Sequence, residues 1–441
     1  MKQRLLITIL LAAVATLAAA QQQRFDFQTA EPESLGIDPA ILREHADELF
    51  RRGTQAYMIV YKDKVVYERY LPEWNRYAPH GTASAAKGIM GGLSLMLAMH
   101  DGLIGLDDPA WKYIPQWRND PIKSRITIRQ LGAHTSGMDD STEPGVSQYE
   151  LPGWKGDFWR QERNPFLISR DEAPVIFAPG TAMKYSNPGI GMLNYAVTVA
   201  VKDTEHKDIR TYLWERLIKN MDIPREEWNV GYGKTFDSDG LPCVATWGGG
   251  SVSARAFAAV GRLLANKGNW NGEQLIDAKV VEAVLKHSGT PSTCSGGFWL
   301  NADMTGNGPW PALPWDTAMA SGAQDQVMIF SSMRDLVIVR FGSANIEQGR
   351  YAENVINEYI GIPLAKALGD PAPYPRSPKI TEIQWAPAST IVRMAAGGAV
   401  RDGSDNWPVT WATVRSRLFW TMRPISDVIG CGCMPPCRAL N

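Results

Sequence analysis

The chain has 441 residues, of which 44% are hydrophobic and 21% are charged. This composition is typical of a globular protein with a large core, and it excludes disorder, collagen and a coiled coil as the main architecture. With 45 basic and 46 acidic side chains the net charge is −1, which argues against a nucleic-acid partner because nucleic-acid binders have a basic excess. The length fits one large domain with an insertion, or two domains.

The first 20 residues have the pattern of a signal peptide. Lys2 and Arg4 precede an apolar run over residues 5–19, and Ala18-Ala19-Ala20 has the small-x-small pattern of a cleavage site. A membrane anchor is the alternative, but the run has about 15 residues where a span needs about 20. No Cys follows it to carry a lipid. We therefore expect cleavage before Gln21 and a periplasmic or secreted protein that no longer contacts the membrane.

The start of the chain predicts a helix, a hairpin and a buried helix. Asp38-Pro39 begins a helix to about residue 51, with Asp as the N-cap and Pro at the first helical position. Residues 55–61 and 65–70 are apolar, β-rich runs that predict a hairpin. Residues 83–100 are apolar on nearly every face, which is typical of a buried helix.

The middle of the chain is predicted to be mainly helical, and strands return near residue 326. Residues 138–183 are predicted to be irregular and aromatic. Periodicity predicts helices over residues 190–201, 212–219, 254–266 and 350–368. Residues 326–331 and 335–341 predict a second hairpin. Because the strands lie far apart in the sequence with helices between them, we expect an α+β core and an inserted α-helical lobe.

The domain is predicted to cover residues 21–368, and residues 369–441 have a different character. Four prolines between residues 370 and 378 predict a linker. A Trp-containing and Cys-containing tail without periodicity follows, for which a truncated second domain is one hypothesis. Export permits disulfides, and Cys243–Cys294 is a candidate bridge. The other three cysteines, Cys431, Cys433 and Cys437, lack the fourth ligand of a zinc site.

The strongest chemical motif is Ser84-Ala85-Ala86-Lys87, at the start of the predicted buried helix. Residues three apart share a helix face, so the Lys87 amine can reach the Ser84 hydroxyl. A hydroxyl is a poor nucleophile until a neighbour takes its proton, and burial lowers the pKa of a lysine towards that of a usable base. The helix N-terminus also favours developing negative charge. The alternative is an N-capping Ser84 and a Lys87 that extends to solvent.

The second motif is Tyr185-Ser186-Asn187. A phenol beside an ammonium is easier to ionise, so Tyr185 would relay the Ser84 proton to a leaving group. Asn187 offers a donor and an acceptor to Lys87 or to a substrate amide. The alternative is a simple turn, because Ser-Asn-Pro-Gly is a strong turn sequence.

The third motif is Ala320-Ser321-Gly322-Ala323, before the predicted strand over residues 326–331. Small residues on an edge strand allow a substrate backbone to lie alongside. The Ala323 N–H would join that of Ser84 as an oxyanion hole. The alternative is an ordinary loop.

The order of these motifs resembles that of the serine β-lactamase and penicillin-binding-protein superfamily. The resemblance is greatest to the class C β-lactamase-related hydrolases, which include esterases, D-amino-acid amidases and 6-aminohexanoate-dimer hydrolases. The segment Leu131-Gly132-Ala133-His134-Thr135-Ser136-Gly137 is similar to their Leu-x-x-His-Thr-Ser-Gly turn. The resemblance covers about residues 30–365. It implies a β-lactamase-like fold, in which an antiparallel sheet flanked by helices carries the α-helical lobe.

The resemblance implies that Ser84 is the acylated nucleophile, that Lys87 and Tyr185 share the acid–base work and that Asn187 positions them. The Ser84 and Ala323 N–H groups would hold the oxyanion, and no metal or cofactor is expected. One departure is Ala320-Ser321-Gly322 in place of Lys-Thr-Gly, whose cation binds a substrate carboxylate in the family. We therefore expect an ester, amide or peptide substrate without that carboxylate. A D-Ala-D-Ala carboxypeptidase or weak β-lactamase, and a non-catalytic binding module, are the alternatives.

Other segments resemble catalytic motifs but lie at the wrong position in the chain. Ser404-Asp405-Asn406 lies in the tail after the third motif, and Lys234-Thr235 is followed by Phe rather than Gly. No G-x-S-x-G elbow is present, which argues against an α/β-hydrolase triad. The histidines form no metal pattern such as H-E-x-x-H, and His134 is predicted to stabilise a turn rather than act as a base. The oligomeric state does not follow from the sequence.

Overall fold

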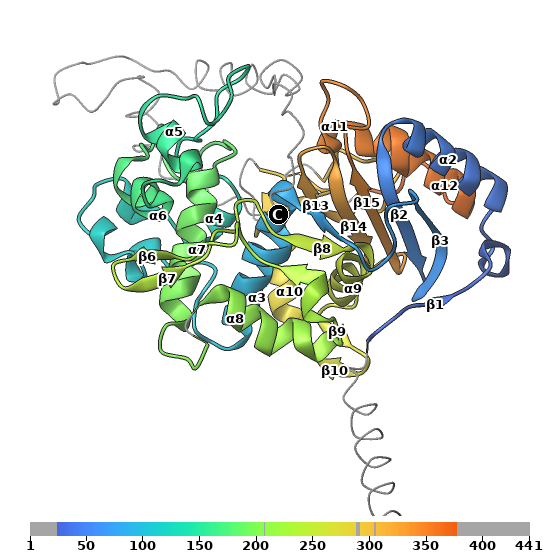
Figure 1. Ribbon diagram of the computed structural model, residues 1–441, viewed down its shortest axis with the longest axis horizontal. Helices are drawn as coiled ribbons and strands as arrows, with labels where there is room; N and C mark the ends of the chain where they lie inside the picture. The colour runs from blue at the N-terminus through green and yellow to red at the C-terminus, as the bar shows by residue number, and fades with distance from the viewer. Residues whose placement is uncertain (1–23, 207, 288–291, 304–305, 377–441) are drawn as a thin grey trace, which may run out of the picture.

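The computed structural model describes residues 24–206, 208–287, 292–303 and 306–376, so the predicted signal peptide and the tail beyond residue 376 lie outside the described residues. Its centre is an eight-stranded sheet in the order β1-β3-β2-β15-β14-β13-β12-β11 (Figure 1). The strands are β1 (Gln28–Thr29), β2 (Thr54–Tyr61), β3 (Lys64–Tyr70), β11 (Cys294–Ser295), β12 (Phe298–Leu300), β13 (Ala318–Gly322), β14 (Gln326–Ser331) and β15 (Leu336–Gly342). Neighbouring strands are antiparallel except β1 and β3, which are parallel. The predicted pairing of early and late strands is confirmed, because β2 lies beside β15.

The early elements form as their local sequence predicts. Helix α2 (Pro39–Arg51) begins where the Asp38 carboxylate accepts hydrogen bonds from the backbone N–H groups of Ala40 and Ile41, at 2.8 and 3.2 Å. Strands β2 and β3 form the predicted hairpin. Lys62 and Asp63 connect them with φ of 48° and 64°, and two left-handed residues make the turn whose twist matches that of paired strands.

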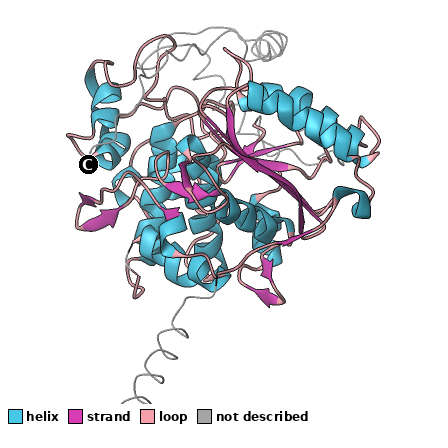
Figure 2. Ribbon diagram, turned by 45° about the vertical axis from the view of Figure 1, so that its right-hand side comes forward, coloured by secondary structure: helices cyan, strands magenta, loops and turns pink. Residues whose placement is uncertain are grey.

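The sheet separates two hydrophobic cores because successive side chains of a strand point to opposite faces. Tyr57 and Ile59 of β2 pack with α2, α11 (Ala352–Ile356) and α12 (Ile362–Leu368) on one face. Met58 and Val60 pack with α9 (Ala254–Ala265) on the other. Figure 2 shows helices on both sides of the sheet.

The inserted helical lobe lies beside the sheet (Figure 1). Its helices are α4 (Ile128–Gly132), α5 (Gly153–Arg160), α6 (Pro165–Leu167), α7 (Asn187–Val201) and α8 (Ile209–Leu213). The prediction that residues 138–183 are irregular is therefore partly wrong. Phe158 and Phe166 are buried against Trp247, with ring centroids 4.7 and 5.2 Å apart, so tertiary packing stabilises short helices that lack a clear periodicity.

Further short elements lie outside the eight-stranded sheet. They are β4 (Pro79–Gly81), β5 (Trp228–Asn229), β6 (Phe236–Ser238), β7 (Leu241–Cys243), β8 (Ser251–Ser253), β9 (Asn269–Trp270), β10 (Glu273–Gln274) and α10 (Ala278–Val284). Within the described residues, no helix combines the length and apolar character needed to cross a bilayer.

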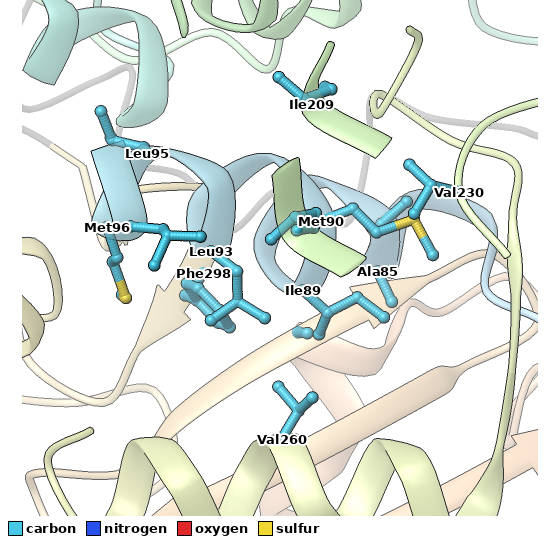
Figure 3. Close-up of a cluster of buried hydrophobic side chains, with 14 of the residues drawn as sticks. Ala85, Ile89, Met90, Leu93, Leu95, Met96, Ile209, Val230, Val260 and Phe298 are labelled. Carbon is cyan, nitrogen blue, oxygen red and sulfur yellow. The ribbon is translucent and has the colours of Figure 1, made fainter. Parts of the chain in front are cut away.

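The predicted buried helix over residues 83–100 forms as three continuous pieces. A 3-10 turn (Ala83–Ala85) leads into a π turn (Lys87–Gly92) and then into α3 (Leu93–His100). Its apolar side chains are enclosed by several elements, as Figure 3 shows for Ala85, Ile89 and Leu93. A Cβ on Gly92 would lie 2.1 Å from the Gly296 carbonyl oxygen, so glycine permits the close approach of the β11–β12 turn.

Candidate active site

Ser84 and Lys87 meet at the start of the buried helical segment. The Lys87 Nζ lies 3.0 Å from the Ser84 Oγ, so the three-residue spacing produces the predicted contact. Lys87 is only 2% exposed, and Ser84 makes no helix-capping hydrogen bond. The alternative in which Ser84 caps a helix and Lys87 extends to solvent is therefore wrong.

The backbone is strained directly before Ser84. Ala83 has a φ of 46°, in the left-handed region that a residue with a Cβ rarely adopts. Thr82 holds this turn, since its Oγ1 donates to the Gly249 carbonyl at 2.7 Å and its N–H donates to the Gly250 carbonyl at 3.2 Å. Strained residues of this kind cluster at functional sites. Ser84 itself is half-buried, so part of the residue is exposed to solvent.

The environment of Lys87 makes its amine a usable base. Burial lowers the pKa of Lys87 to about 7, while the Asp140 carboxylate and the Cys294 thiol act in the opposite direction. Lys87 also donates a hydrogen bond to the Trp247 carbonyl oxygen. Because the pKa is near neutral, a large fraction of the lysine is uncharged at pH 7, and its lone pair can accept the Ser84 proton.

Tyr185 reaches the same pair from the helical lobe. Its side chain forms a hydrogen bond with Ser84, and the Lys87 Nζ lies over the Tyr185 ring, 4.7 Å from the centroid. The expectation that the neighbouring ammonium eases ionisation of the phenol is wrong. Burial raises the pKa of Tyr185 well above its usual value, and the hydrogen bond with Ser84 offsets this only in part. Tyr185 is therefore protonated at neutral pH and can donate a proton.

His134 and Asn187 hold the Tyr185 segment in place. The His134 Nδ1 accepts a hydrogen bond from the Ser186 N–H at 3.1 Å, and its ring centroid lies 4.6 Å from that of Tyr185. Burial and the charge of Lys87 lower the pKa of His134 to about 3, so the ring stays neutral. Asn187 donates to the Asp140 carboxylate from Nδ2 at 2.9 Å and from its backbone N–H at 2.8 Å. Its Oδ1 is buried without a hydrogen-bond partner in the described part of the chain.

The third motif lies against the turn that contains Ser84. A Cβ on Gly322, the last residue of β13, would lie 2.3 Å from the Thr82 carbonyl oxygen and 2.9 Å from the Ser84 nitrogen. The prediction of an edge strand is wrong for β13 as a whole, because β12 and β14 flank it. The described ladder with β12 ends at Met319, however, so Ser321 and Gly322 pair only with β14. Ala323 follows as an exposed turn residue, and its role in an oxyanion hole stays a prediction.

Comparison with known protein families shows to which family the chain belongs. The family described as Beta-lactamase matches residues 42–292, more than half of the chain. The chain belongs to the β-lactamase family. It is 25% identical over 171 residues to a β-lactamase from Pseudomonas fluorescens, and the match covers 36% of this chain and 41% of that protein. The chain therefore spans less than half the length of this curated relative.

Solved structures share the fold of this β-lactamase-family chain. A putative 6-aminohexanoate-dimer hydrolase from Bacillus anthracis has a TM-score of 0.57 and 19% identity, over 79% of this chain and 89% of that one. A family VIII carboxylesterase has a TM-score of 0.51 and 15% identity, over 70% and 93%. At these identities the similarity shows the β-lactamase-like fold, which confirms the expected fold class.

Several groups around this β-lactamase-family site were not predicted from the sequence. Asp140 binds Asn187, and Trp247 contributes its carbonyl oxygen to Lys87. Trp299 of β12 lies nearly parallel to Tyr185, with an interplanar angle of 2° and ring centroids 6.5 Å apart. Glu353 of α11 forms a side-chain hydrogen bond with Ser321. Each lies far from Ser84 in the chain and outside its local motifs, so only the fold brings them together.

The predicted Cys243–Cys294 disulfide is wrong, because both cysteines are free and buried. Cys243 lies on β7 beside Ser238 and Thr198 of the lobe. Cys294 lies on β11 beside the Gly132 carbonyl oxygen, 3.7 Å from its Sγ. Within the described residues, His, Cys, Asp and Glu side chains form no group of three or more that could hold a metal ion.

Gly322→Ala is expected to reduce turnover by about 100-fold, because its Cβ would displace the Ser84 turn and a shift of about 1 Å at reacting atoms has that effect. Assays of p-nitrophenyl ester hydrolysis and of the melting temperature test this. Gly81→Ala is the control, since Gly81 lies in nearby β4 with no atom within 4 Å of the added Cβ. Wild-type activity of Gly322→Ala would contradict the close approach.

Proposed function

We propose that this protein is an exported serine hydrolase that cleaves an ester or amide bond of a small molecule through an acyl-enzyme on Ser84. The observation that supports this best is the buried Lys87 amine, 3.0 Å from the Ser84 Oγ and with a pKa of about 7. The contacts of the Ser84 hydroxyl with the Lys87 amine and the Tyr185 phenol support this proposal, because a nucleophilic hydroxyl is activated by an adjacent base.

In the proposed acylation, the Ser84 Oγ bonds to the substrate carbonyl carbon while its proton passes to the neutral Lys87 amine. The oxyanion would accept hydrogen bonds from the Ser84 and Ala323 N–H groups. When the tetrahedral intermediate collapses, the alcohol or amine leaves with the proton of the Tyr185 hydroxyl. Lys87 then returns its proton to Tyr185. Water repeats the sequence on the acyl-enzyme, which releases the acid and regenerates Ser84.

The third motif favours substrates without a carboxylate beside the scissile bond. Ala320 stands where the related β-lactamases have the lysine of Lys-Thr-Gly, and Ala320 is fully buried. A site without that cation loses its counter-ion for a substrate carboxylate. We therefore favour simple esters and amides over D-Ala-D-Ala peptides and β-lactams. The apolar leader over residues 5–19 supports a site of action outside the cytoplasm.

The test is to trap the acyl-enzyme. A p-nitrophenyl ester should give a burst of one p-nitrophenol per chain, and intact mass should rise by the acyl group. After labelling with a fluorophosphonate, the modified peptide should contain Ser84. A label on another residue would overturn the assignment, and no label together with no burst would favour a binding module. Faster turnover of nitrocefin or D-Ala-D-Ala peptides than of esters would favour the β-lactamase or carboxypeptidase alternative.

A further inference from the structure

Glu353 is a charged group of the site that the proposed acyl transfer does not use. Glu353 lies on α11, the helix that covers the face of the sheet towards which the Ser321 side chain points. The Glu353 side chain forms a hydrogen bond with the Ser321 side chain. Its backbone carbonyl accepts a hydrogen bond from the Trp310 Nε1 at 3.0 Å, which fixes this point of the helix. Glu353 as a residue is half-buried, and these two contacts hold its side chain in position.

The surroundings of Glu353 lack a compensating cation. None of the ion pairs among the described residues includes it, and the nearby Asp325 has the same sign of charge. Burial, with a contribution from Asp325, raises the pKa of Glu353 to about 7. A carboxylate that is desolvated and unpaired in this way is stabilised by any cation that arrives beside it.

Two aromatic rings lie on the same side of the site as Glu353, whose charge acts on the Tyr185 phenol. Trp299 pairs across the ladder with Met319, which is two residues before Ser321 on the same strand, so Trp299 and Ser321 share a face of the sheet. Trp299 is half-buried and parallel to Tyr185, which is itself half-buried. The faces of Trp and Tyr rings attract cations. The Trp299 ring therefore shares the face of the sheet on which Ser321 binds Glu353, and the Tyr185 ring lies within reach of the Glu353 charge.

We infer that Glu353, together with Trp299 and Tyr185, binds a positively charged ammonium group of the substrate. This inference rests on the proposed function and adds the substrate class: esters or amides that have an amine or a quaternary ammonium near the scissile bond. The charge preference is the reverse of that implied by a Lys-Thr-Gly motif. Near neutral pH, the arriving cation would also shift Glu353 to its ionised form, which strengthens the pairing.

The test compares substrates of equal shape that differ in charge. In the first pair, acetylthiocholine and 3,3-dimethylbutyl thioacetate, the charged member has its charge on the leaving group. In the second pair, the p-nitrophenyl esters of β-alanine and of butyric acid, the charged member has its charge on the acyl group. The wild-type enzyme should prefer the charged member of at least one pair by about 10-fold or more in kcat/KM, as expected for one charge-assisted contact.

Glu353→Gln should reduce that preference to within about 2-fold, and Glu353→Lys should reverse it. Glu358→Gln is the matched control, because Glu358 is exposed in the same helical region and pairs with Arg350, so it should keep the wild-type preference. Circular dichroism and the melting temperature verify the fold of each variant. No preference in either pair, or a preference that survives Glu353→Gln, would overturn the inference.

The two proposals fail in different ways. If neutral esters acylate Ser84 but the charged members are not preferred, only the ammonium site is wrong. If no ester acylates Ser84, the proposed function is wrong. In that case, calorimetric titration of Ser84→Ala with the two thioesters still measures the affinity of the ammonium site for the charged and for the neutral compound. Equal affinity for the charged and the neutral compound would overturn the ammonium site independently of turnover.

Discussion

Ser84→Ala is expected to lower kcat/KM for p-nitrophenyl esters by about 10⁵-fold, because the acyl-enzyme can no longer form and only the binding groups remain. The fold should be unaffected. Ser84 is half-buried and its side chain caps no helix, so removal of one oxygen leaves the packing of Ala85 and Ile89 intact. The measurement is steady-state hydrolysis together with the melting temperature and the loss of fluorophosphonate labelling.

Ser94→Ala is the matched control for this variant. Ser94 lies on the same helical segment, is buried, and its hydroxyl donates to the Met90 carbonyl at 2.6 Å, away from Lys87 and Tyr185. It should retain the burst and the label. If Ser84→Ala retained more than a few per cent of wild-type activity, another nucleophile would have to be sought.

Lys87→Met is expected to lower kcat/KM by about 10³- to 10⁴-fold, because it removes the base that accepts the Ser84 proton. Methionine fills a similar volume in this buried position, so the variant should fold without an uncompensated charge. Lys279→Met is the control, since Lys279 is 84% exposed on α10 and should leave activity unchanged.

The pKa of Lys87 predicts how the activity of the wild-type enzyme depends on pH. Lys87 must be uncharged to act as a base, and its pKa is about 7, so kcat/KM should rise with pH and level off above a midpoint near 7. His134 stays neutral over this range because its pKa is about 3. The residual activity of Lys87→Met should lack this rise. A wild-type profile that is flat between pH 5 and 8.5 would contradict a catalytic role for Lys87.

The amino-acid sequence determined the elements whose causes are local. Asp38-Pro39 begins α2 because the cap and the first helical residue are adjacent, and two apolar, β-rich runs formed the β2–β3 hairpin. The spacing of Ser84 and Lys87 was enough to predict their contact, since a helical turn brings such neighbours together. The order of the three motifs was enough to indicate the family and, through it, the α+β fold.

Tertiary structure decided what depends on burial and on partners distant in the chain. Whether the Tyr185 phenol ionises more or less easily depends on its burial, which outweighs the hydrogen bond with Ser84 and makes the direction of the pKa shift the reverse of the predicted one. The cysteines at 243 and 294 stay apart because one packs in the lobe and the other beside the sheet edge. Glu353 joins Ser321 only because α11 folds over β13, and no local pattern in the sequence encodes that long-range packing.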